Sequence, residues 1–123
     1  MRALWVGVAG FFGAMSRYWF DGWVTRLSGG SFPWGTFAVN ISGCFAIGLL
    51  TTVFTERLLP HPTVRVAVTV GFVGAYTTFS TYAYESLRQI QDGALGLAVA
   101  NVVGSVVLGV AAAWLGVVAG RAL

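Results

Sequence analysis

The stretch that decides the fold, residues 71–82, reads Gly71-Phe72-Val73-Gly74-Ala75-Tyr76-Thr77-Thr78-Phe79-Ser80-Thr81-Tyr82. Two glycines and four serine or threonine residues cluster here, near the middle of a long apolar segment. Glycine and β-branched threonine are poor helix formers, and hydroxyl side chains compete for backbone groups. We therefore predict a helix that is broken between Gly74 and Phe79. The alternative is a continuous helix whose small residues form a packing face.

The composition of the whole chain indicates a membrane protein. Of its 123 residues, 57% are hydrophobic and 9% are charged, with a mean hydropathy of +0.80, whereas a soluble domain carries about 25% charged residues. Four apolar segments, residues 3–24, 33–54, 64–87 and 93–120, each reach the roughly 20 residues that cross a bilayer. We predict an all-α protein with four transmembrane helices, the third broken at mid-membrane, in a single transmembrane domain over residues 1–123.

A break at this depth has functional meaning. Non-helical backbone is tolerated inside a membrane only where it is buried in protein or lines a cavity. Exposed carbonyl groups at such a break could also hold a cation, as in transporters with discontinuous helices. Because the short connections leave almost nothing for a soluble domain, the function is expected inside the membrane.

The charged residues predict a weak preference for one orientation in the membrane. An even number of spans places both chain ends on one side, which would carry Arg2, Arg57, Arg65 and Arg121. The opposite side would carry Arg26 and Arg88. Because the excess of Lys and Arg near span ends sets orientation, four arginines against two suggest that the chain inserts both ways.

Several classes of protein are disfavoured. The net charge of +3 comes from dispersed arginines, which form no basic patch for nucleic acid. Cys44 is the only cysteine, so no internal disulfide forms, and a small buried thiol is expected. No nucleophile, acid–base pair or metal-ligand spacing indicates an enzyme.

Polar side chains inside the spans are candidates for function or for helix packing. Thr36 and Asn40 share one face of the second span, and Asn101 and Ser105 share one face of the fourth. Each group either bonds a neighbouring helix or faces water or an ion. Close helix packing explains a further set on the fourth span, Gly109, Gly116 and Gly120.

Charged and aromatic residues add further candidates. Arg17 either pairs with Asp21 four residues later or extends to the membrane interface, and Glu85 lies near the end of the third span. No span carries a central carboxylate, which counts against a proton-coupled exporter. Phe79 and Tyr82 share a helical face, where their positive ring edges could favour an anion or could simply pack in a core.

Three motifs follow one another along the chain: Gly13-Ala14-x-x-Arg17-Tyr18, Trp34-Gly35-Thr36-x-x-x-Asn40-x-x-Gly43, and Gly71-x-x-Gly74-x-x-Thr77-Thr78-Phe79-Ser80-Thr81. With these motifs the chain resembles the small fluoride channels known as Fluc or CrcB. The resemblance covers the whole chain, and the third motif is its most specific part.

The resemblance implies a fluoride-selective channel that exports toxic fluoride passively, excludes chloride and is not an enzyme. It implies an antiparallel, dual-topology homodimer with two pores at the dimer interface. Its place would be the plasma membrane, the inner membrane of a bacterium, as a multi-pass protein. The expected partners are the fluoride ion, a second copy of the chain and the lipid bilayer.

The resemblance also assigns roles to the pore residues by match to the motifs. Asn40 would be an amide donor facing the pore, and Thr36 a second polar lining residue. Phe79 would be the first ring of the family's phenylalanine box, and Ser80 and Thr81 would add hydroxyl groups near the rings.

Further roles concern the ends of the pore and the dimer axis. Ser105 would extend a polar track along the fourth span, and Glu85 and Arg17 would lie near a pore mouth or act structurally. A sodium ion at the dimer two-fold would be held by the backbone carbonyl groups of Gly74 and Thr77 from each subunit.

Three positions depart from the family pattern. Tyr82 stands where the second ring of the box is usually phenylalanine, and its hydroxyl could bond the ion or rotate the ring. Asn101 stands where tyrosine is frequent, and Gly109 where a second serine is frequent, so the polar track could be shorter or differently hydrated.

Two other functions remain open at this point. A small dual-topology multidrug exporter would need a buried glutamate in the first span, where this chain has Arg17. A non-transporting membrane assembly protein would need no broken third helix and would tolerate loss of the Asn40 amide.

Overall fold

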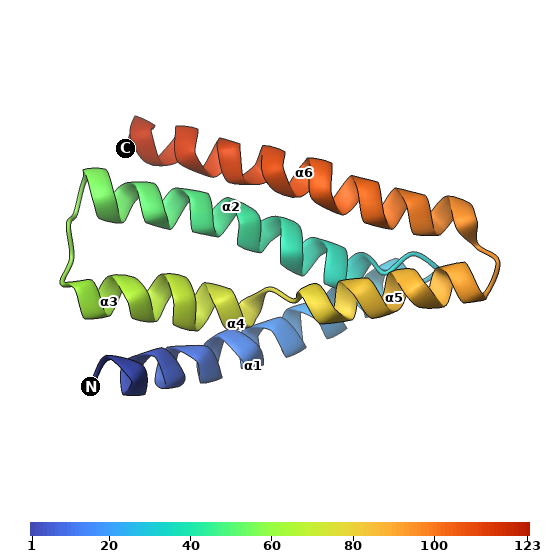
Figure 1. The fold of residues 1–123 in the computed structure, drawn as a ribbon, viewed down its shortest axis with the longest axis horizontal. Coiled ribbons are helices and arrows are strands. Elements are labelled where there is room, and N and C mark those ends of the chain that lie inside the picture. Colours follow the sequence, from blue (N-terminus) through green and yellow to red (C-terminus); the bar gives the residue numbers. More distant parts are fainter.

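The computed structural model describes all residues 1–123, and every regular element in it is helical (Figure 1). Three uninterrupted helices are α1 (Arg2–Ser28), α2 (Trp34–Glu56) and α6 (Leu95–Ala122). A fourth rod lies between α2 and α6 in sequence and is divided into α3 (Pro62–Val66), the π-helix η1 (Ala67–Val73), α4 (Gly74–Tyr76) and α5 (Phe79–Gln91). The prediction of four helical rods with a broken third one is confirmed.

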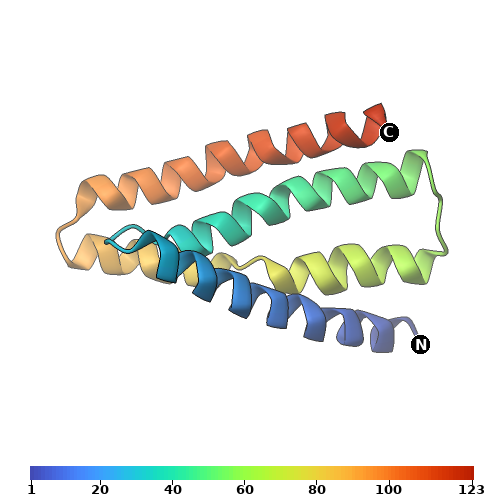
Figure 2. The same ribbon diagram turned by 180° about the vertical axis from the view of Figure 1, so that it is seen from behind.

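Short turns connect the rods, and both chain termini lie at the same end of the molecule (Figures 1 and 2). Gly29 and Gly30 have φ angles of 60° and 80°, and Gly93 has 77°, a region that favours glycine. At the start of α3, the His61 side chain accepts a hydrogen bond of 3.1 Å from Thr63 N. His61 is therefore a helix cap in a turn, consistent with its exposed position between two prolines.

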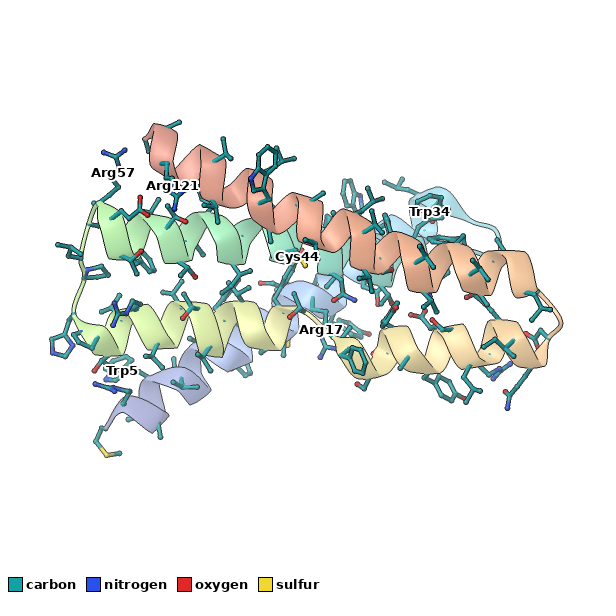
Figure 3. The ribbon with its side chains drawn as sticks, turned by 45° about the horizontal axis from the view of Figure 1, so that its top comes forward. Trp5, Arg17, Trp34, Cys44, Arg57 and Arg121 are labelled. Atoms are coloured by element: carbon teal, nitrogen blue, oxygen red, sulfur yellow. The ribbon has the colours of Figure 1, made fainter.

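Helices α2 and α6 run in the same direction and make the most extensive helix–helix contact in the fold. A Cβ atom placed on Gly48 would lie 2.2 Å from the carbonyl oxygen of Ala113, and one on Gly116 would lie 2.2 Å from that of Phe45. The two backbones therefore touch directly, which confirms the packing role predicted for the glycines of α6. Cys44 of α2 faces this contact (Figure 3), because its sulfur would lie 3.3 Å from a Cβ on Gly109.

The parallel arrangement brings two helix C-termini together, where the partial negative charges of the helix dipoles add. The side chains of two arginines, Arg57 and Arg121, lie at this end of the molecule and supply positive charge to it (Figure 3). Arg57 donates to the carbonyl oxygen of Arg121, and Arg121 Nε forms an ion pair of 3.4 Å with Glu56 Oε1.

On the other side of the molecule, α1 packs against η1, again through glycine. A Cβ on Gly13 would lie 2.2 Å from the carbonyl oxygen of Phe72, and one on Gly71 would lie 2.6 Å from that of Val6. The wider turn of a π-helix is uncommon and is frequently found at functional sites. Here it leads directly into the break.

Most apolar side chains lie on the outside of the molecule. Only 17 of the 123 residues are buried, and the valines of α6 include Val103, Val107 and Val110 at 53%, 58% and 68% exposure. Helices α2 and α6 are each long and apolar enough to cross a membrane. An outer surface of this kind requires lipid or another protein to cover it.

Candidate functional site

The third rod is broken at two extended residues. Helix α4 ends at Tyr76, Thr77 has φ −85° and ψ 159°, Thr78 has φ −146° and ψ 116°, and α5 begins at Phe79. The predicted interval from Gly74 to Phe79 contains this break, so the prediction is confirmed. The free backbone groups of the two half-helices consequently meet near the middle of the rod (Figures 1 and 2).

The Asn40 side chain of α2 holds the break in place. Its Nδ2 donates to the carbonyl oxygen of Thr78 over 2.9 Å, and its Oδ1 accepts from Thr78 N over 2.8 Å. The amide therefore pairs with Thr78 as a neighbouring β-strand would, and satisfies both backbone groups of Thr78. One of the two Nδ2 hydrogens is not used by this pairing.

Threonine hydroxyl groups complete the two half-helix ends. Thr78 Oγ1 accepts from Thr81 N over 3.2 Å and donates to Thr81 Oγ1 over 3.0 Å, so it caps α5. Thr77 Oγ1 donates to the carbonyl oxygen of Val73 over 3.2 Å. The predicted pore hydroxyl of Thr81 is thus engaged with the cap, whereas Ser80 is exposed.

Helix α2 makes two more contacts with the break. A Cβ on Gly43 would lie 2.1 Å from Thr77 Cγ2, so only glycine permits this approach. One residue earlier, the Ser42 and Tyr76 hydroxyl groups are 2.9 Å apart. Three residues within about one turn of α2, Asn40, Ser42 and Gly43, therefore fix the conformation of the break.

An open groove of about 360 Å³ lies beside the break, and we refer to it as the central groove. Its walls come from α2, the third rod and α6. Six of the predicted site residues line it: Asn40, Gly74, Thr77, Phe79, Tyr82 and Ser105. Residues from three sequence regions are thereby brought to one place.

The two aromatic rings of the central groove differ in their surroundings. The ring centroids of Phe79 and Tyr82 are 5.7 Å apart, and Phe79 is 79% exposed. The Tyr82 hydroxyl donates to the carbonyl oxygen of Val102 over 2.9 Å. Its proton is therefore directed to α6, and of the two roles considered for this hydroxyl the geometry favours orientation of the ring.

A chain of polar groups extends from the central groove into the α5–α6 interface. Ser105 Oγ donates to Asn101 Oδ1 over 3.2 Å, and Asn101 Nδ2 donates to Ser86 Oγ over 2.9 Å. Ser86 Oγ in turn donates to the carbonyl oxygen of Tyr82 over 2.8 Å. Asn101 is only 2% exposed, so its role is interhelical hydrogen bonding.

Two of the predicted site residues lie elsewhere. Thr36 and Glu85 line a separate cavity of about 340 Å³, the end cavity, at the end of the molecule opposite the termini. It is open on one side and is lined by the last turns of α1 and α5, residues 29–33 and the first turn of α2. The predicted link between Glu85 and a pore mouth is compatible with this position.

Arg17 lies beside the break in Figure 3 and lines neither cavity. It makes no ion pair with Asp21, so that alternative is wrong. Its Nε is buried without a hydrogen-bond partner.

Comparison with known proteins agrees with these features. Residues 4–117 match the family described as "CrcB-like protein, Camphor Resistance (CrcB)". The chain belongs to the CrcB family. A relative of this CrcB chain in Acidobacterium capsulatum is named "Fluoride-specific ion channel FluC" and is 47% identical over 121 residues, covering 98% of this chain and 97% of the relative. A relative of the same name in Solibacter usitatus is 46% identical, with 98% of this chain and 99% of the relative covered. Another in Magnetococcus marinus is 45% identical, with 98% of each chain covered.

The CrcB chain contains functional candidates that the sequence did not reveal. Ser86 connects α5 to α6, and Thr78 both pairs with Asn40 and caps α5. Ser86 shares a helical face with Phe79 and Tyr82, at positions i, i+3 and i+7, and this spacing could have identified it. The pairing of Thr78 had no local indication, because Asn40 is 38 residues away.

Gly74, one of the two residues of the CrcB chain expected to bind sodium, lies on an open surface. Gly74 is exposed, and a Cβ placed on it would meet only Thr69 O, at 3.9 Å. Because Thr77 and Thr78 are extended, the last carbonyl groups of α4 are not consumed by a following helical turn. Carbonyl oxygens are the ligands that hard cations prefer.

Proposed function

We propose that this protein is a fluoride-selective ion channel through which toxic fluoride leaves the cell passively, across the plasma membrane. The observation that carries the proposal is the broken third rod, held by Asn40 beside the rings of Phe79 and Tyr82. The names of the full-length relatives support the choice of ion.

The chemistry of the central groove suits a small, strongly hydrated anion. A selective pore has to replace the hydration shell of the ion with several close groups. The free Nδ2 hydrogen of Asn40, the positive ring edges and the N-terminal end of α5 are neutral or partial charges. No arginine lines the groove, so an ion is attracted without being bound too tightly to leave.

We further propose that all four rods span the membrane and that two copies associate as an antiparallel, dual-topology homodimer. The high exposure of Phe79 and the open side of the central groove support a partner that completes the pore. In this dimer two pores lie at the dimer interface, Ser80, Thr81 and Ser105 add hydroxyl groups to each pore, and Thr36 lines its mouth in the end cavity. The weak arginine bias between the two ends, four against two, supports insertion both ways.

The proposed dimer holds a structural sodium ion on its two-fold axis. Carbonyl oxygens of Gly74 and Thr77 from each copy are its ligands. The exposed, uncrowded surface at Gly74 supports this assignment. The ion would supply positive charge at mid-membrane and connect the two copies.

The test is fluoride efflux from liposomes that contain the purified protein and potassium fluoride, with potassium chloride liposomes beside them. We expect a potassium ionophore to release fluoride while chloride is retained. Asn40→Asp and Phe79→Ile should abolish the flux without changing the size of the purified dimer, and Gly96→Ala serves as a control because its Cβ has open space. Wild-type flux in either folded variant would remove that residue from the mechanism, and no flux from wild-type dimers would refute the channel.

A further inference from the structure

The hydrogen bonds between α5 and α6 have a direction that bears on the central groove. We define the polar chain as Ser105 and Asn101 of α6 and Ser86 of α5. Ser105 Oγ donates to Asn101 Oδ1, and Asn101 Nδ2 donates to Ser86 Oγ. Ser86 Oγ in turn donates to the carbonyl oxygen of Tyr82. Each bond of the polar chain therefore runs away from the central groove, which Ser105 lines.

In this direction the Ser105 side chain offers no donor to the central groove. A hydroxyl group carries one hydrogen and two lone pairs, and the hydrogen of Ser105 is directed to Asn101. The lone pairs that remain repel an anion, whereas a path for fluoride has to replace the water around the ion with donors. Ser105 therefore contributes to such a path only if its hydroxyl group turns.

We propose that the polar chain reverses its direction when an anion reaches Ser105, which makes Asn101 and Ser86 positioning residues of the ion path. This proposal rests on the fluoride channel proposed above. Rotation of the Asn101 amide by half a turn exchanges its acceptor Oδ1 and its donor Nδ2. Nδ2 then donates to Ser105 Oγ, Oδ1 accepts from Ser86 Oγ, and the Ser105 hydrogen is released to the ion. The two contacts, of 3.2 and 2.9 Å, suit a hydrogen bond in either direction.

The reversal conserves the number of hydrogen bonds. It breaks the bond of 2.8 Å from Ser86 Oγ to the Tyr82 carbonyl oxygen and adds one from Ser105 to the ion. The carbonyl oxygen keeps a partner, because Tyr82 lies inside α5 and takes part in the backbone bonding of that helix. A hydrogen bond to a charged acceptor is about twice as strong as a neutral one. The Ser86–Tyr82 bond therefore holds the observed direction without the ion, and the ion favours the reversed one.

Burial couples the two side chains. Asn101 and Ser86 are 2% and 5% exposed, so water does not replace a bond that either of them loses. If the amide turned and the Ser86 hydroxyl did not, two oxygen atoms without a hydrogen between them would face each other in a buried contact, which is costly. Ser86 and Asn101 consequently turn together.

The test is the fluoride concentration at which efflux from liposomes is half-maximal, measured with purified full-length protein. Ser86→Ala removes the bond to Tyr82 that opposes the reversal and keeps the Asn101 amide. We expect the half-maximal concentration to fall about threefold, the factor equivalent to an average side-chain hydrogen bond in a membrane. A purely structural role for Ser86 would not tighten the interaction with fluoride.

A second background assigns the effect to Ser105. In Ser105→Ala there is no hydroxyl to release, so adding Ser86→Ala should not shift the half-maximal concentration further. Thr55→Ala is the matched control, because it removes a hydroxyl bonded to the Thr51 carbonyl oxygen in the last turn of α2. Ser86→Cys keeps a weak thiol donor and should give a smaller shift in the same direction, and it serves as the test if Ser86→Ala does not fold.

The wild-type protein separates this proposal from the channel itself. If the wild type conducts fluoride and the position 86 variants leave the half-maximal concentration unchanged or raise it, the reversal is refuted and the channel stands. An equal shift in the Ser105→Ala background would also refute the reversal, because Ser86 would then act without Ser105. No fluoride efflux from wild-type dimers would refute the channel and the reversal with it.

Discussion

Replacing Gly43 by alanine tests how α2 fixes the break. The added Cβ would lie 2.1 Å from Thr77 Cγ2, 3.3 Å from Tyr76 Cδ1 and 3.6 Å from Thr77 Cβ. Nonbonded carbon atoms prefer a separation of about 3.5–4.0 Å. Thr77 therefore has to move by roughly 1.5 Å, although it is held by Val73 O and precedes the residue paired with Asn40.

The size of the effect follows from two opposing terms. Overpacking of a closed contact costs about 1–3 kcal/mol, and alanine regains up to about 1 kcal/mol of helix propensity over glycine. We expect Gly43→Ala to lose about 1–2 kcal/mol of stability. Thr77→Ser removes Cγ2 and keeps the hydroxyl that bonds Val73 O, so the double variant should recover most of this loss.

The assay is thermal unfolding of the detergent-purified protein, followed by size-exclusion chromatography after heating, with Thr77→Ser alone as the matched control. Fluoride efflux is measured on the same preparations, and we expect it to fall in Gly43→Ala and to recover in the double variant. Unchanged stability of Gly43→Ala, or no recovery on adding Thr77→Ser, would refute the contact as the cause.

Three further substitutions address the other contacts. Tyr82→Phe removes the hydrogen bond from the Tyr82 hydroxyl to the Val102 carbonyl oxygen, worth about 0.6 kcal/mol in a membrane. Fluoride efflux should persist in this variant, and a loss of efflux would show that the hydroxyl contacts the ion. Asn101→Leu leaves its buried partners unpaired and should lower stability by about 1–3 kcal/mol, measured as a lower thermal midpoint; an unchanged midpoint would contradict the polar chain. Gly116→Ala forces apart two backbones and should abolish the monodisperse protein peak, whereas Gly96→Ala should not; equal yields would mean that the α2–α6 contact is looser than described.

Local sequence was sufficient for the helical rods and for the region of the break. The four apolar runs give the rods, and the glycines and threonines of residues 71–82 identify where the helix weakens. The position of the break at Thr77 and Thr78 depends on Asn40 and Gly43, which come from another helix. A tertiary contact of this kind has no local pattern, so composition could define only an interval.

The candidate site was predictable to the same extent. The motif residues around the break do meet in one groove, since they share helical faces that point to the same place. Glu85 and Thr36 were expected on the same pathway but line the end cavity, because each lies one or more turns farther along its helix. The i, i+4 spacing of Arg17 and Asp21 suggested an ion pair that does not form in the structure.

The unequal lengths of the rods have a consequence for the surrounding lipid. Helices α1 and α6 contain 27 and 28 residues and α2 contains 23, which correspond to about 40, 42 and 35 Å at 1.5 Å per residue. A typical hydrocarbon core is about 30 Å thick. In the proposed orientation the longer helices have to tilt or extend into the headgroup layer more than α2 does. The backbones of α2 and α6 are in direct contact, so a change in bilayer thickness would tilt these two helices together and α1 separately. The length of the lipid acyl chains therefore becomes a means of altering the geometry at the break from outside the protein.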